Sequence, residues 1–251
     1  MPARDKIFFA SDLHLGAPYF SDPIRHEKRI VLWLESIEPE AKVLYLLGDV
    51  FDYWFEYRSV VPRGFIRFLG QLARMADNGT DIHIFTGNHD VWMFDYLPSQ
   101  FRCTIHESPY RFEAFGKTFF VGHGDDFGYD RGYSLLMWCF HNKFLQALYR
   151  WLHPDLANLI ATTWSRRSRM SHAKHPTRIR LTDEFSVRFA TEQIAKGEQV
   201  DFIVFGHRHK VINYAIPDSP ARVLVIGDWL YNFTYAVFDG REFSIIHDDH
   251  E

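Results

Sequence analysis

Five short motifs carry carboxylate, imidazole and amide side chains in a fixed order along the chain. They read DLH at 12–14, GDVFD at 48–52, GNHD at 87–90, GH at 122–123 and GHRH at 206–209. A mixture of oxygen and nitrogen ligands without thiolates suits Mn²⁺, Fe or Zn²⁺, whereas Ca²⁺ takes oxygen ligands. The candidate metal ligands are therefore Asp12, His14, Asp49, Asn88, His123, His207 and His209.

The number and spacing of these ligands indicate two metal ions. Seven ligands are too many for one ion, but they suffice for two ions that share a bridging carboxylate. In DLH and in HRH one residue separates two ligands, so on an extended backbone both side chains point to the same side. A single motif of this kind is more often structural than metal-binding. Five in order predict a centre in which two ions about 3.5–4 Å apart hold a phosphoryl group and activate water.

The elements that must position these ligands are visible as short apolar runs, each ending at a polar motif. Continuous runs of four to six apolar residues bounded by turn residues are typical of buried strands. We expect strands at 6–10, 42–47, 81–85, 117–121, 201–205 and 223–226, and helices at 24–38, 62–77, 132–151, 155–168 and 182–196. Alternation of strands and helices predicts an α/β sheet with its ligand site at the carboxyl ends of the strands.

The last part of the chain follows a different pattern, of strand, turn and strand. PDSP at 217–220 and DG at 239–240 are hairpin signals. Combined with the earlier alternation, they indicate stacked sheets with flanking helices. We expect residues 1–251 to form a single domain, which is interrupted by a helical insertion at 130–176.

Composition narrows the class of partner and the compartment. The formal net charge of -4 argues against a broad electrostatic contact with nucleic acid. Cys103 and Cys139 lie far apart without a CxxC spacing, which favours free thiols in a reducing compartment. No run approaches the ~20 apolar residues that span a bilayer. We therefore expect a cytoplasmic protein, and we expect no obligate protein partner.

The ordered motifs resemble those of the calcineurin-like metallophosphoesterases over residues 6–210. The resemblance implies an α/β (α+β) fold of four layers, with two mixed β-sheets between helices and a dinuclear metal site. It also implies that one metal is bound by Asp12, His14 and His209, that the other is bound by Asn88, His123 and His207, and that Asp49 bridges them.

The histidine of GNHD has a different implied role. In this family it is typically not a ligand but lies above the phosphate as an electrophile or a general acid. On that basis His89 would stabilise charge or protonate the leaving group, and Asp90 would fix its tautomer. The residues alone also allow a simpler interpretation, in which His89 is an ordinary histidine of a loop.

The insertion at 130–176 allows two interpretations. It could be a helical hairpin packed on the core, with its arginines on a solvated face. It could instead be a lid with an apolar groove for acyl chains, in which Arg166, Arg167 and Arg169 meet phosphate. An amphipathic, aromatic-rich insertion beside a basic cluster also suits a position at a membrane surface.

The insertion together with GNHDVWMFDYLP resembles the UDP-2,3-diacylglucosamine pyrophosphatases of bacterial lipid A biosynthesis. This resemblance implies Mn²⁺-dependent hydrolysis of UDP-2,3-diacylglucosamine to UMP and 2,3-diacylglucosamine 1-phosphate, with peripheral association at the inner membrane. It implies substrate contacts at Asp130, Tyr133 and the arginine cluster.

One position departs from that pattern. Well-known members of the pyrophosphatase family have Arg where this chain has His89. Two alternatives therefore stay open: a related enzyme that acts on another nucleotide or lipid phosphoester, and a non-catalytic interaction module with the same fold.

Overall fold

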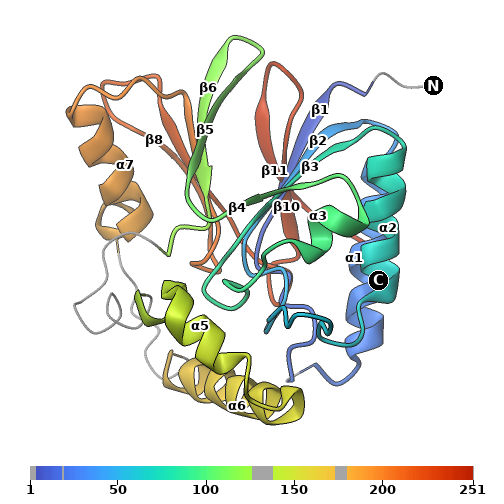
Figure 1. The fold of residues 1–251 in the computed structure, drawn as a ribbon. Coiled ribbons are helices and arrows are strands. Elements are labelled where there is room, and N and C mark those ends of the chain that lie inside the picture. Colours follow the sequence, from blue (N-terminus) through green and yellow to red (C-terminus); the bar gives the residue numbers. More distant parts are fainter. Residues whose placement is uncertain (1–3, 19, 126–137, 173–179, 251) are drawn as a thin grey trace.

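Two β-sheets form the centre of the molecule in the computed structural model (Figure 1). The structure describes residues 4–18, 20–125, 138–172 and 180–250, with only the backbone described for 164–172. The first sheet has the order β11-β10-β1-β2-β3-β4. Its strands are β1 (Lys6–Ala10), β2 (Ala41–Leu47), β3 (Asp81–Phe85), β4 (Thr104–His106), β10 (Thr234–Phe238) and β11 (Phe243–His247).

The second sheet has the order β5-β6-β7-β9-β8. Its strands are β5 (Tyr110–Ala114), β6 (Lys117–Gly122), β7 (Phe202–Phe205), β8 (Val211–Ala215) and β9 (Arg222–Ile226). Both sheets are mixed. β1, β2, β3 and β4 run parallel in the first sheet, and β6, β7 and β9 run parallel in the second, with antiparallel strands at the other positions.

Alternating side chains along the strands produce the layers. On β1, Ile7 and Phe9 pack into the cluster shared by the two sheets, whereas Phe8 and Ala10 face the helices. This is the two-residue period of a strand that is covered on both faces. The outer face of the second sheet packs on α7 (Phe185–Ala195) through Val187. The predicted four layers are thus helices, sheet, sheet and helix.

Two helices cover the outer face of the first sheet. α1 (Pro23–Ile37) begins after Asp22, whose carboxylate accepts the N–H of Arg25, and Pro23 suits the first turn because it lacks an N–H. α2 (Ile66–Asp77) has no such side-chain cap of its own. Instead, Glu27 of α1 accepts the N–H groups of Arg67 and Phe68 at 2.9 and 3.1 Å. This contact fixes the pairing of α1 with α2.

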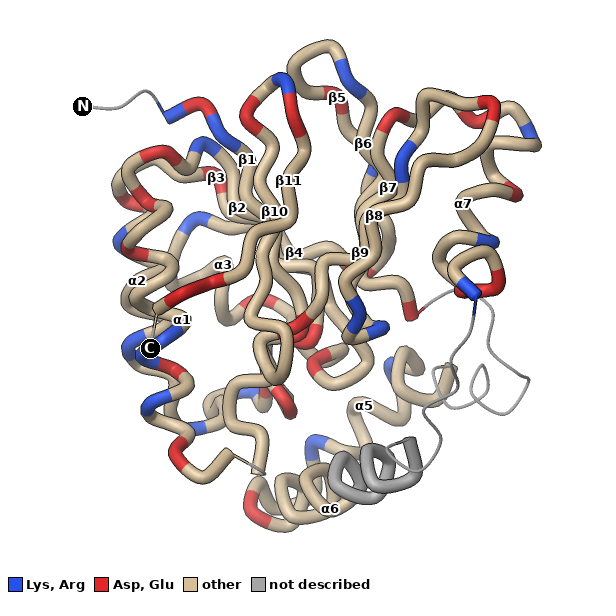
Figure 2. Tube along the Cα trace, turned by 180° about the vertical axis from the view of Figure 1, so that it is seen from behind, with Lys and Arg blue, Asp and Glu red and all other residues tan. Residues whose placement is uncertain are grey.

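The insertion contributes two helices at one end of the sheets. α5 (Lys143–Tyr149) and α6 (Pro154–His172) lie across this end in both views (Figures 1 and 2). The predicted helix at 132–151 is wrong in its described part, because it breaks at Asn142. The side chain of Asn142 accepts the N–H groups of Phe144 and Leu145 and so starts α5 as a new helix.

The six predicted strands and both predicted hairpins are confirmed, with bounds that differ by at most one or two residues. The short strands β4 and β5 and the five-residue helix α3 (Tyr96–Gln100) were not predicted. Acidic and basic residues are interspersed along the described chain (Figure 2), so the charges of opposite sign offset one another locally.

Candidate metal centre

The predicted ligands come together at one end of the two sheets. Asp12 and His14 follow β1, Asp49 follows β2 and Asn88 follows β3, in the parallel part of the first sheet. The ligands from the second sheet follow its parallel strands: His123 follows β6, and His207 and His209 follow β7. The carboxyl ends of parallel strands meet at the same edge, which is why motifs far apart in the chain become neighbours.

Most of these ligands lie on an unusual backbone. Five of the nine described non-glycine residues with positive φ are predicted ligands, with φ of 45–64°: Asp12, His14, Asp49, His207 and His209. The explanation of DxH and HxH by an extended backbone is therefore wrong. Left-handed conformations for residues other than glycine are costly and cluster at functional sites.

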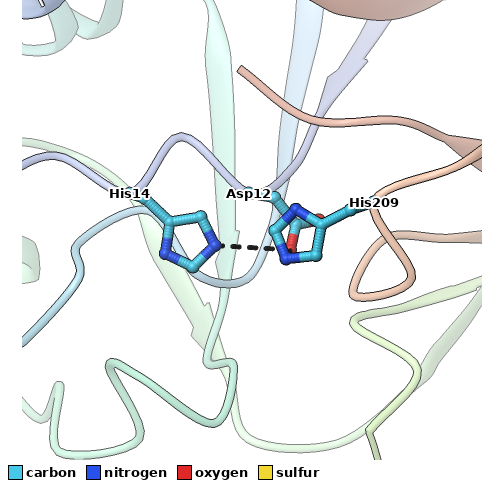
Figure 3. Close-up of side chains that lie close together, drawn as sticks. All are labelled: Asp12, His14 and His209. Atoms are coloured by element: carbon cyan, nitrogen blue, oxygen red, sulfur yellow. Dashed lines mark ion pairs between the residues drawn. The ribbon is translucent and has the colours of Figure 1, made fainter. Parts of the chain in front are cut away.

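The first ligand group consists of Asp12, His14 and His209 (Figure 3). The Oδ1 atom of Asp12 lies 3.7 Å from Nε2 of His14 and 3.5 Å from Nε2 of His209. Its other oxygen, Oδ2, accepts the hydroxyl of Ser11 at 2.6 Å and the N–H of His207 at 2.8 Å. Oδ1 is buried without a hydrogen-bond partner among the described residues. A buried, unpaired carboxylate oxygen between two imidazole nitrogens fits a cation ligand.

The second group is built around His123. Its Nε2 lies 3.4 Å from Oδ2 of Asp49, 3.2 Å from Nδ1 of His207 and 3.3 Å from Oδ1 of Asn88. Asp49, His123 and His207 form a further cluster with the geometry of a metal site. The two histidines of GHRH therefore belong to different groups, as the family resemblance implied.

Asp49 lies between the two groups. Its Oδ2 is 3.7 Å from Nε2 of His14, in addition to its contact with His123. Its Oδ1 is already used, because it accepts the N–H of His89 at 2.9 Å. Oδ2 is thus the oxygen available to both groups, which is the arrangement expected of a bridging carboxylate.

Each ligand histidine that offers Nε2 has its Nδ1 occupied on the far side of the ring. His123 donates from Nδ1 to the carbonyl of Leu47 at 2.8 Å, and Nδ1 of His14 lies 3.4 Å from Oδ1 of Asp52. His209 is held by Oδ2 of Asp228 at 3.0 Å. Such partners fix the tautomer in which the lone pair lies on Nε2, the form that a metal ligand requires.

Asp228 was missed in the sequence. It is fully buried and follows β9 in the segment GDW, at the same end of the sheet as the other motifs. An Asp directly after an apolar run was therefore a usable signal. GDW has no histidine beside it, so it did not resemble a ligand motif.

The electrostatics favour ionised carboxylates. Burial would raise the pKa of Asp12, but the neighbouring His209 and His14 hold it below its ordinary value. Burial also opposes ionisation of Asp49, whose pKa is lowered by His123 and His89. Burial tends to lower the pKa of His123, but Asp49 raises it overall. The pKa of His207 falls to about 3 because of burial and the charge of His123.

His89 lies beside both groups without belonging to the second. Its ligand atom is within 4.8 Å of those of His14 and Asp49. Its ring meets the ring of His14 edge-on at 4.9 Å, and its Nδ1 donates to the carbonyl of Asp52 at 3.0 Å. The side chain is 16% exposed, so it can reach a ligand that approaches from solvent.

The role predicted for Asp90 as the orienter of His89 is wrong. Its Oδ1 accepts the N–H of Gly87 at 2.7 Å, and its Oδ2 accepts those of Val50 and Phe51 at 2.7 and 3.2 Å. Asp90 therefore ties the loop after β3 to the loop after β2. Burial and the charge of Asp49 raise its pKa to about 7. Nδ1 of His89 is bonded to the carbonyl of Asp52 instead.

The predicted substrate contacts in the insertion stay predictions. Asp130 and Tyr133 lie outside the described residues. The positions of Arg166, Arg167 and Arg169 fall on α6, where side chains are not described.

The fold and the ligand set define a class, the dinuclear metallophosphoesterases. Residues 5–211 match the Calcineurin-like phosphoesterase family, and the chain belongs to this family. A solved archaeal phosphodiesterase superposes with a TM-score of 0.51 at 15% identity, covering 96% of this chain and 98% of that one, which shows the shared fold.

The curated relatives are more specific. The chain is 42% identical to the UDP-2,3-diacylglucosamine hydrolase of Porphyromonas gingivalis, over 94% of this chain and 95% of that protein. It is 27% identical to the UDP-2,3-diacylglucosamine hydrolase of Nitrosococcus oceani, over 88% of this chain and 86% of that protein.

Proposed function

We propose that this chain hydrolyses the diphosphate bond of UDP-2,3-diacylglucosamine, a step of lipid A biosynthesis. Water adds to the α-phosphorus, and the products are UMP and 2,3-diacylglucosamine 1-phosphate. The observation that carries this proposal is the similarity to curated hydrolases of this substrate along nearly the whole chain. The ligand set supports it, because carboxylate, imidazole and amide side chains from the strand ends lie close together in two adjoining groups that share Asp49.

The cofactors in this proposal are two divalent metal ions, which we take to be Mn²⁺ because the resemblance to the pyrophosphatase family implies it; a donor set of carboxylates and imidazoles is compatible with this ion. Asp12, His14 and His209 would hold one ion, Asn88, His123 and His207 the other, and Oδ2 of Asp49 both. When bound, such a pair supplies Lewis-acid charge and lowers the pKa of bound water.

His89 supplies the movable proton in this proposal. The carbonyl of Asp52 accepts its Nδ1–H and so fixes the orientation of the ring beside the two ligand groups. As imidazolium it would stabilise charge on the phosphoryl oxygens or protonate the leaving group. Substitution of His89 with Ala should lower kcat by about 10²–10⁴ while both metals stay bound. An unchanged rate would remove His89 from the mechanism.

In this proposal, the acyl chains of the substrate and the membrane surface contact the end of the molecule formed by α5 and α6. Large apolar side chains on α5 and in the turn after it are widely exposed, with Phe144 at 76% and Trp151 at 88%. Within the described residues, no helix is sufficiently long and apolar to cross a bilayer. Because this end exposes large apolar side chains, we propose a cytoplasmic enzyme that is peripherally associated with the inner membrane through it. Phe144→Glu combined with Trp151→Glu should reduce co-sedimentation with anionic phospholipid vesicles. Unchanged co-sedimentation would contradict this placement.

The decisive experiment is incubation with Mn²⁺ and UDP-2,3-diacylglucosamine in ¹⁸O-labelled water, with the products identified by mass. We expect unlabelled 2,3-diacylglucosamine 1-phosphate and UMP that carries the label. Cleavage of a generic phosphodiester without cleavage of this substrate would indicate another phosphoester. Metal binding without any hydrolysis would indicate a non-catalytic module.

A further inference from the structure

An aromatic cluster joins the insertion to the loops of the metal centre. It consists of Phe55, Trp92, Phe140 and Tyr149, and we call it the aromatic latch. The ring of Tyr149 lies 4.8 Å from that of Phe55 and 4.9 Å from that of Trp92. Trp92 also lies 5.1 Å from Phe55 and 5.2 Å from Phe140. Each ring thus contacts at least one ring from another segment of the chain.

Hydrogen bonds reinforce the latch at its two largest members. The hydroxyl of Tyr149 donates to the carbonyl of Ala157 in α6 at 3.0 Å and lies 3.3 Å from the hydroxyl of Tyr53. Since the single proton of Tyr149 points to Ala157, Tyr53 is the donor in the second contact. The indole N–H of Trp92 donates to the carbonyl of Phe140 at 2.9 Å. One phenol therefore connects α5, α6 and the loop after β2.

The latch contacts the loops after β2 and β3, and both loops contain residues of the metal centre. Tyr53 follows Asp52, whose carboxylate faces His14 and whose carbonyl holds His89. Trp92 stands three residues after His89, and its carbonyl accepts the N–H of Glu56 at 3.3 Å. The loops after β2 and β3 are thus hydrogen-bonded to each other next to the residues that contact the latch.

Among the described residues, the rest of α5 is largely exposed. None of its seven residues is buried, and its apolar residues Phe144 and Leu148 face away into solvent. A helix without a buried stripe is positioned by the few contacts that it makes. The latch supplies ring contacts and hydrogen bonds of this kind.

We propose that Tyr149 and Trp92 are positioning residues. They couple the position of the insertion to the conformation of the loops after β2 and β3, which carry residues of the metal centre. The inference rests on the proposed function, in which the insertion receives the lipid half of the substrate. The latch then places that half in a fixed relation to Asp52 and His89. The residues act through the loops and do not touch the reacting atoms.

The coupling is testable without substrate, by hydrogen exchange of the Mn²⁺-loaded protein. In the structure, the N–H of Asp52 is bonded to the carbonyl of Leu15 at 3.0 Å, and that of Glu56 to Trp92. Tyr149→Phe removes both hydroxyl contacts, and Tyr149→Leu removes the ring as well. We expect faster exchange in 50–57 and 86–93 in these variants, greater for Leu, with unchanged exchange in β7. Tyr214→Phe, a half-buried tyrosine on β8, is the matched control.

Kinetics provide the second measurement. Tyr149→Phe should lower kcat/KM for UDP-2,3-diacylglucosamine by about 3- to 10-fold, the value of an ordinary hydrogen bond. Most of the loss should be in kcat, because the loops that hold His14 and His89 are displaced. Tyr53→Phe should lose less, and the double variant less than the product of the two losses, since the residues share one contact.

Two results would overturn the inference. One is unchanged exchange in 50–57 in both Tyr149 variants, and the other is faster exchange spread evenly over the whole chain. Failure of the proposed function is distinguishable, because there the wild-type protein leaves UDP-2,3-diacylglucosamine intact whatever the exchange data show.

Discussion

Replacement of Asp228 with Asn tests whether the buried carboxylate sets the tautomer of His209. The Oδ1 atom of Asp228 accepts three main-chain N–H groups, from Leu230, Tyr231 and Asn232, at 2.7–3.0 Å. In Asp228→Asn the amide oxygen must take that place, because an NH₂ group there would face three donors. The NH₂ group then takes the place of Oδ2, where it faces Nδ1 of His209 and also the side-chain amide of Asn232, which donates to Oδ2 at 3.2 Å.

The size of the effect follows from this exchange of partners. His209 must move its proton from Nδ1 to Nε2 to avoid two opposed donors, and Nε2 is the atom that points to Asp12. The lost bond involves a charged carboxylate and contributes about 1.5–3 kcal/mol. That corresponds to a factor of about 10–150 in affinity, in line with the 10- to 100-fold cost of removing such an orienting group.

Calorimetric titration of the metal-free protein with Mn²⁺ measures this directly. We expect one of two sites to weaken by about 10- to 100-fold. The other site should change less than about threefold, since Asp228 does not contact the group around His123. Asp239→Asn is the matched control, because Asp239 also accepts two main-chain N–H groups but lies in the exposed turn between β10 and β11. Equal weakening of both sites, or of neither, would refute the reasoning.

Three further predictions concern the same centre. Gly87→Ala should abolish metal binding with the far-ultraviolet circular dichroism retained, because its Cβ would lie 2.3 Å from Oδ1 of Asp49 and 2.9 Å from Nε2 of His123. Gly70→Ala, which meets nothing within 4 Å, should bind normally. Because Asp49 raises the pKa of His123 and a metal needs its lone pair, metal binding should release protons and weaken by up to about tenfold per unit of falling pH. Titrations in buffers of different ionisation enthalpy measure those protons, and a heat independent of buffer would contradict this. Asp90→Asn should destabilise the metal-loaded protein by about 1–3 kcal/mol in urea, because its NH₂ group must face the N–H of Gly87 or of Val50. Asp95→Asn, at an exposed position without a side-chain cap bond, should not.

The sequence was sufficient for the layers because each buried strand is a continuous apolar run closed by a turn residue. β7, with the sequence FIVF, is buried along its whole length, and a short run of this kind bounded by turn residues is typical of a buried strand. β4 and β5 were not predicted, for the opposite reason. They are short, partly exposed and mostly polar, so neither alternation nor a continuous run marks them. Only pairing with β3 and β6 identifies them as strands.

The identity of the ligands could be predicted from the sequence, whereas the hydrogen-bond partners that orient them could not. A ligand must be a carboxylate, imidazole or amide, and in this sequence such residues recur in order at the ends of five apolar runs. A supporting group needs only an acceptor in the right place, and for His123 it is the main-chain carbonyl of Leu47, which no sequence pattern can reveal. Asp90 shows the same limit, because adjacency to His89 suggested a contact that the fold gives instead to main-chain N–H groups.

The left-handed backbone conformation of five ligand residues explains why the metal centre requires loops from both sheets. Each such residue costs of order 1–3 kcal/mol unless its surroundings hold it. Here the loops hold one another: the N–H of Asp12 donates to Gly48, that of His14 to Asp49, and that of Trp229 to the carbonyl of Asp12. Ligands from the first sheet are thus fixed by main-chain bonds to neighbouring strand ends before any cation arrives. Removal of one ligand side chain leaves this backbone intact, whereas a change at Gly87 or Asp90 disturbs several ligands together. Substitutions at such positions, which supply no metal ligand, should therefore impair metal binding as much as loss of a ligand does.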